Sequence, residues 1–126
     1  MKIEVSIGEI VDKLSILRIK KNNITDSAKL VNVNKEYDYL YEIVFGELRV
    51  AEDDFLKLAS INGKLWDIED LLRDKESIKS FDQDFIELAR SVYYTNDKRA
   101  EIKKEINTKY GSLFVEEKSY KNYTSL

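Results

Sequence analysis

Residues 82–111 have the sequence DQDFIELARSVYYTNDKRAEIKKEINTKYG, in which apolar side chains recur every three or four positions. This is the spacing of one face of an α-helix. Asp82 can cap the start of such a helix, and Gly111 stands where glycine favours its end. The expected buried face consists of Phe85, Leu88, Ala89, Val92, Ile102, Ile106 and Tyr110. The stretch therefore predicts one long helix near the end of the chain.

The composition favours helices in the rest of the chain as well. The 126 residues include no proline and only four glycines, whereas average usage would give about six prolines. Proline breaks helix interiors, so its absence leaves long helices uninterrupted. At roughly 100–200 residues per domain, we expect residues 1–126 to form a single helical domain.

A first helix is predicted over residues 7–23. Ser6 and Glu9 form a capping box, in which the serine oxygen accepts from the Glu9 amide and the carboxylate reaches back. One apolar arc follows, made of Ile7, Ile10, Val11, Leu14 and Leu17. Ile16 and Ile19 fall on the opposite side, which is typical of a central helix or a subunit interface.

The middle of the chain is predicted to be helical, as one helix or two between residues 28 and 76. Asp26 or Ser27 can cap its start, and Asp53-Asp54 is typical of a new helix start. Asn62-Gly63 could interrupt it. Residues 58–72 carry apolar side chains at the spacing of a coiled-coil seam, namely Leu58, Ile61, Leu65, Ile68 and Leu72.

These elements predict an all-α fold, an antiparallel bundle of three to four helices. Residues 2–5 alternate polar and apolar side chains, as a short strand does. They could pair with residues 113–115 in a two-stranded sheet that ties the termini together. Residues 113–126 are otherwise expected to be a partly extended tail.

Several functional classes are excluded or disfavoured. The chain has no histidine and no cysteine, which excludes a Ser-His-Asp triad, a thiol nucleophile, a disulfide and the usual zinc sites. The net charge of −3 has the wrong sign for a nucleic-acid-binding protein. No apolar run is long enough to span a membrane and no signal peptide is evident, so we expect a cytoplasmic protein. We also predict that the protein binds no cofactor.

Polar side chains interrupt the apolar arc of the last helix. Asn96, Arg99, Lys103 and Asn107 lie in it at steps of three, four and four residues. A charge that faces a core needs a counter-charge, and Asp12 on the first helix is the candidate partner. One interpretation is a filled structural network. The other is a pocket whose cations bind an anionic small molecule.

Paired acids raise the question of a metal site. Glu9 and Asp12, like Asp67 and Asp70, are three residues apart and could hold a hard cation such as Mg²⁺. The all-α nucleotide pyrophosphohydrolases use such pairs, but this chain lacks their Glu-x-x-Glu before a Glu-x-x-Asp. We therefore predict no metal site.

Four segments resemble one family along nearly the whole chain: VSIGEIVDKLSIL at 5–17, LWDIED at 65–70, VYYTNDKRAEIK at 92–103 and EEKSY at 116–120. It is a family of small helical proteins from marine bacteria and phages with no established activity. The resemblance consequently implies no functional residue.

Residues 9–17 are also similar to the opening helix of the helical chorismate mutases. That resemblance implies a dicarboxylate held by inward cations without metal or cofactor, here Arg18, Arg99 and Lys103. The full set of arginines in that family is not matched.

We expect a non-enzymatic protein-interaction module that forms a homo-oligomer. The two-sided first helix, the seam at residues 58–72 and the outward-facing Tyr39 and Tyr94 favour it; Tyr37 and Tyr41 are expected to face the core. The alternative is a small enzyme or binding protein for an anionic metabolite.

Overall fold

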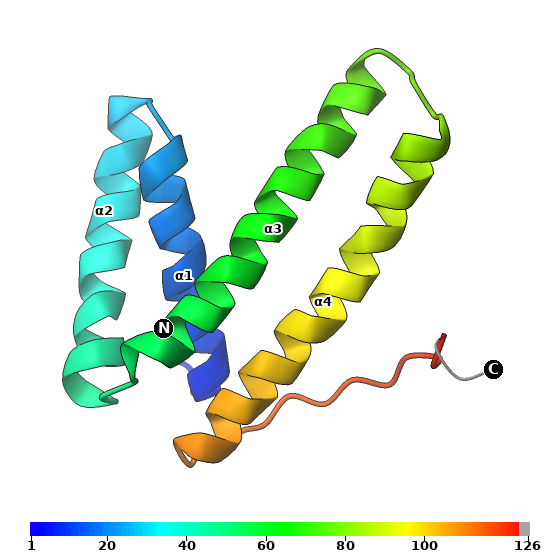
Figure 1. The fold of residues 1–126 in the computed structure, drawn as a ribbon. Helices are drawn as coiled ribbons and strands as arrows, with labels where there is room; N and C mark the ends of the chain where they lie inside the picture. The colour runs from blue at the N-terminus through cyan, green and yellow to red at the C-terminus, as the bar shows by residue number, and fades with distance from the viewer. Residues whose placement is uncertain (124–126) are drawn as a thin grey trace.

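Four α-helices make up most of the computed structural model, which describes residues 1–123. They are α1 (Ile7–Asn23), α2 (Ser27–Tyr41), α3 (Glu52–Ser77) and α4 (Gln83–Lys109), and the π-helical turn η1 (Glu42–Glu47) continues α2. Two antiparallel hairpins result, α1–α2 and α3–α4 (Figure 1). No strand occurs in residues 1–123. The predicted all-α class is confirmed. None of the helices described is both long and apolar enough to cross a membrane.

Local capping chemistry sets the helix starts where the sequence predicted them. Ser6 Oγ accepts from the Glu9 amide at 3.2 Å, Asp26 Oδ1 from the Lys29 amide at 3.0 Å, and Asp82 Oδ1 from the Phe85 amide at 3.0 Å. Each bond satisfies one backbone N–H that the first turn leaves without a partner.

The middle of the chain forms two helices. The break follows η1, where Arg49 adopts a left-handed backbone conformation with φ of 53°. α3 then begins with the acidic residues Glu52, Asp53 and Asp54, which suit the positive end of the helix dipole. Asn62-Gly63 does not interrupt α3.

The core lies at the end of the molecule where all the elements meet. α1 packs against α2, α3 and α4, which agrees with its apolar side chains on two faces. The buried apolar side chains are Val11, Leu14, Leu17, Val33, Tyr37, Val44, Val50, Phe55, Leu58 and Ile106.

The tyrosines of α2 divide differently from the prediction. Tyr37 is buried and Tyr39 is exposed, but Tyr41 is 41% exposed. The ring of Phe45 stands between Tyr41 and Phe55, with centroids 4.8 and 5.4 Å away. The placement of Tyr41 in the core was therefore wrong, because Phe45 covers Phe55 in its place.

The outer half of the α3–α4 hairpin has little cover. The two hairpins diverge towards their far ends (Figure 1), and no residue between 63 and 102 is fully buried. Phe85, Leu88 and Val92 are half-buried, and Ala89 is exposed, contrary to prediction. The reason is length: α1 has 17 residues, whereas α3 and α4 have 26 and 27.

The predicted β pairing of the termini is wrong. Residues 111–123 turn back and run beside α4 (Figure 1), where Lys104 Nζ contacts Glu117 at 2.9 Å. Tyr123 O–H donates to Asp97 at 2.7 Å, and this bond raises the pKa of Tyr123 to about 12. Charge pairs and ring contacts thus hold the segment where a strand ladder was expected. Residues 124–126 of the predicted tail lie outside the described residues.

Candidate functional site

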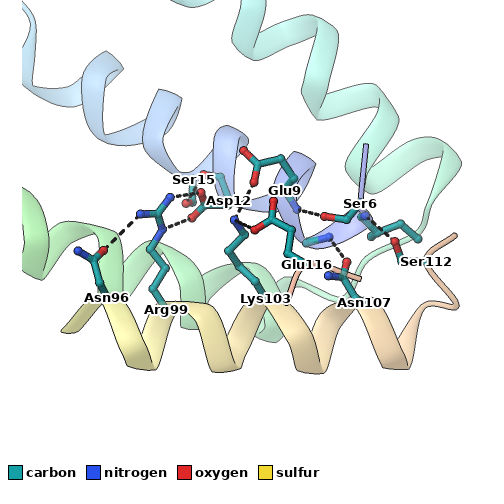
Figure 2. Close-up of polar contacts among 12 residues, drawn as sticks. Ser6, Glu9, Asp12, Ser15, Asn96, Arg99, Lys103, Asn107, Ser112 and Glu116 are labelled. Carbon is teal, nitrogen blue, oxygen red and sulfur yellow. Dashed lines mark hydrogen bonds and ion pairs between the residues drawn. The ribbon is translucent and has the colours of Figure 1, made fainter. Parts of the chain in front are cut away.

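One face of α4 carries a row of polar side chains directed at α1. Figure 2 shows Asn96, Arg99, Lys103 and Asn107 along α4, with α1 above them. The structure therefore brings together four of the predicted site residues, and Asp12 with them.

Asp12 is the centre of the row and is only 1% exposed. Arg99 donates from Nε and Nη2 to its two oxygens, at 2.9 and 2.6 Å. Asn62 Nδ2 donates to the same carboxylate at 2.8 Å and to Ser15 Oγ at 2.7 Å. The hydrogen bonds that Arg99 donates to Asp12 raise the pKa of Arg99. A buried charge is thus fully paired, as its desolvation requires.

Lys103 forms the next ion pair along α4. Its Nζ donates to Glu9 at 2.7 Å and to Glu116 of the C-terminal segment at 3.4 Å. The bond from Lys103 lowers the pKa of Glu9. The serine half of the predicted capping box is present. The Glu9 carboxylate, however, contacts the charged ammonium of Lys103.

The start of α1 is capped by residues far away in the sequence. The Gly8 amide donates to Asn107 Oδ1 at 2.6 Å, and the Ile7 amide donates to Ser112 Oγ at 3.0 Å. A Cβ atom on Gly8 would lie 2.6 Å from the backbone oxygen of Lys103. The helices therefore approach closely at Gly8, and these amides have no capacity left for an anion.

Arg18 lies apart from the other predicted cations. Its Nε and Nη2 donate to the hydroxyl of Tyr37 at 3.2 and 3.0 Å, and its guanidinium stands 4.5 Å from the ring centroid of Phe55. Six residues along a helix correspond to about 240°, so Arg18 and Asp12 leave α1 on different sides. The trio that the chorismate mutase resemblance implied is not assembled.

A cleft of about 440 Å³ opens beside the network, between the end of α1 and the α3–α4 hairpin. Its volume is within the range of ligand sites. The cleft is lined by Ile16, Ile19, Asn62, Leu65, Trp66, Glu69, Asp70, Arg73, Asn96 and Arg99. The polar groups of the network bond to one another, and Asn62, Asn96 and Arg99 are its members that line the cleft.

A second hollow of about 430 Å³ continues the cleft along the hairpin. We call it the outer groove; it is lined by Glu69, Leu72, Arg73, Glu76, Phe85 and Val92. Glu69 and Arg73 line both hollows. Neither forms an ion pair with another residue in the range 1–123.

The model of one protein family, described as a family of unknown function (DUF6165), matches residues 1–126. The chain belongs to this family. The match confirms the resemblance to a family without established activity, and it does not test the marine and phage origin. No curated protein and no solved structure matches the chain.

Two groups of interacting or co-facing side chains that the structure shows were not predicted from the sequence. Asn62, Trp66, Glu69 and Arg73 recur at steps of four, three and four, a signal that they share one face of α3. The other group joins α3 to the end of α4, where Asp54 accepts from Lys109 at 2.8 Å and from the Tyr110 hydroxyl at 2.6 Å. These bonds, led by that from Lys109, lower the pKa of Asp54.

The chemistry available to this DUF6165 member is that of charge pairing. Glu9 and Asp12 are each bound by a cation of α4, and Asp67 and Asp70 are exposed. Residues 1–123 contain no group of three or more acids that could hold a metal ion.

Proposed function

We propose that the protein is a non-enzymatic module that associates with a second copy of itself through the outer half of the α3–α4 hairpin. The single observation that carries this proposal is the pair of adjoining hollows, the cleft and the outer groove, which share Glu69 and Arg73. A helix pair normally buries its apolar stripe against further structure. Here α1 covers only the inner end of the hairpin.

The walls of the hollow combine accessible apolar side chains with charged ones. Leu65, Trp66, Leu72, Phe85 and Val92 line it, and none of them is fully buried. Exposed apolar side chains that gather in a groove rimmed by polar residues are typical of an interaction site. Covering it would complete the packing of the outer half of the hairpin.

The charges of the hollow favour a second copy as the partner. Glu69 and Arg73 stand about one helical turn apart, have opposite signs and lack partners in residues 1–123. A two-fold axis presents the same patch from both subunits, so a patch with both signs can complement itself. Arginine is also enriched at protein interfaces.

An anionic metabolite is a weaker candidate. Arg99 and Lys103 already contact Asp12, Glu9 and Glu116 at 3.4 Å or less. Glu69 and Asp70 add negative charge to the cleft. The cations expected to attract such a ligand are therefore largely neutralised.

Sedimentation equilibrium of three full-length chains tests the proposal. The wild type is expected to dimerise. The change Arg73→Glu adds a negative charge beside Glu69 in the hollow and should weaken the dimer by about tenfold or more. The matched control is Lys35→Glu, the same charge change at an exposed position of α2 that lines neither hollow, and its dissociation constant should equal that of the wild type. Equal weakening by both variants, or a wild type that stays monomeric, would contradict the proposal.

A further inference from the structure

We infer that two copies pair with their α3 helices antiparallel, so that the turn between α3 and α4 of each copy enters the cleft of the other. Glu69 of each copy then meets Arg73 of its partner. This inference rests on the proposed self-association and names the geometry of that interface.

The register follows from the unpaired charges. In an antiparallel helix pair related by a two-fold axis, the number of a residue in one copy and the number of the residue at the same level in the other copy always add up to the same value. Pairing Glu69 with Arg73 sets this sum at about 142 and places the axis beside residue 71. Ile78 then lies at the level of position 64 along the partner's α3, in the stretch where Leu65 and Trp66 line the partner's cleft.

The turn that reaches the cleft is apolar and exposed. Ile78 is 73% exposed and Phe81 is 55% exposed, so the tip of the hairpin presents two large apolar side chains three residues apart. The cleft offers four apolar side chains, Ile16, Ile19, Leu65 and Trp66. The register thus brings together two apolar surfaces that the single chain leaves open.

The turn is also held in a fixed shape. The Lys79 amide donates to the Glu76 carbonyl at 3.0 Å, and the Ser80 amide donates to the Lys75 carbonyl at 2.9 Å. Lys75 Nζ lies 2.9 Å from Asp82 on the other side of the turn. A rigid tip loses little conformational entropy when it binds.

Polar groups of the cleft match the end of the helix that enters it. An α-helix has a partial negative charge at its C-terminus, where the last carbonyl groups lack helical partners. Within residues 1–123, Arg99 uses three of its five N–H groups, towards Asp12 and Asn96. The other two can donate to carbonyl oxygens at the end of the partner's α3, which keep a second lone pair beside their bonds within the turn.

A charge exchange within one chain tests the register. Arg73→Glu and Glu69→Arg should each weaken the dimer by about tenfold or more, because like charges then face each other across the axis. The double variant E69R/R73E restores two opposite pairs, so its dissociation constant should return to within about threefold of the wild-type value. Both side chains sit on the surface of α3, and circular dichroism checks that each variant keeps its helices.

The tip is tested separately by Ile78→Ser, which should weaken the dimer by about tenfold or more because both copies lose an apolar contact. The control is Leu113→Ser, since Leu113 is 74% exposed, follows α4 in the C-terminal segment and lines neither hollow. It should leave the dissociation constant unchanged.

A dimer that E69R/R73E fails to restore, or that is indifferent to Ile78→Ser, would overturn this pairing while self-association stands. A wild-type chain that remains monomeric would overturn both.

Discussion

At the scale of single residues, Asp12 is the charge on which the packing of α1 against α4 depends most. Arg99→Met would leave this buried carboxylate with Asn62 as its remaining side-chain donor. Breaking one side of a buried ion pair costs about 3–5 kcal/mol. We expect the free energy of unfolding, measured by urea titration, to fall by that amount.

The control for this measurement is Arg90→Met, which removes an arginine of α4 that pairs with Glu87 at the surface. Exposed pairs contribute little, so no measurable change is expected. A loss of less than about 1 kcal/mol in Arg99→Met would mean that Asp12 remains solvated after all.

Gly8 and Gly63 provide a second comparison of single residues. Alanine at position 8 would bring Cβ within 2.6 Å of the Lys103 backbone oxygen, whereas nothing lies within 4 Å of a Cβ at position 63. Gly8→Ala should therefore destabilise the fold by about 1–3 kcal/mol. Gly63→Ala, in the interior of α3, should stabilise it by about 0.5–1 kcal/mol. Thermal or urea unfolding measures both; two effects of the same sign would contradict the close approach of α1 and α4.

At the scale of elements, the α3–α4 hairpin should have two levels of stability. Its inner half packs on α1 around Leu58 and Ile106, whereas residues 63–102 contain no fully buried side chain. Local opening is easiest where buried contacts are few. In dilute solution, amide hydrogens of residues 66–95 should exchange faster than those of residues 102–107. Raising the protein concentration should slow the exchange of residues 66–95, because dimer formation covers them. Uniform protection along α4 at all concentrations would contradict the two levels of stability within the hairpin.

The elements that could be predicted are those with local signals. Ser6, Asp26 and Asp82 bond to amides three residues away, so a short stretch of sequence is enough to predict these helix caps. The pairing of Asp12 with Arg99 was also predictable, since a charge in an apolar arc needs a counter-charge.

Other features depend on tertiary geometry and have no such signal. Glu9 contacts Lys103 because α4 lies next to the start of α1, and the segment after Gly111 lies beside α4 because Glu116 and Glu117 meet its lysines. The hollow along α3 arises from the difference in length between α1 and the α3–α4 hairpin. Neither its walls nor the angle between the hairpins is encoded in one element.

At the scale of the whole molecule, stability should be nearly independent of pH around neutrality and should fall in acid. The chain has no histidine, the side chain that ordinarily titrates between pH 5 and 8. Glu9 and Asp54 have pKa values lowered from 4.5 and 3.8 by their bonds to Lys103 and Lys109. A carboxyl group with a lowered pKa in the folded state stabilises it above the unfolded pKa, and this contribution is lost as the pH falls through the folded value.

The free energy of unfolding should accordingly be nearly constant between about pH 6 and 8 and should decrease below about pH 4.5. Urea titrations across this range measure it, and Glu9→Gln should remove part of the decrease. A steep change near neutral pH, or an undiminished acid loss in Glu9→Gln, would contradict the roles given to these carboxylates.

Self-association through the hairpin is tested most directly by the molar mass of the wild-type chain in solution. Light scattering should report 14.8 kDa when dilute and should approach twice that mass as the concentration rises from about 1 μM to 1 mM. A constant mass of 14.8 kDa over the whole range would contradict the account.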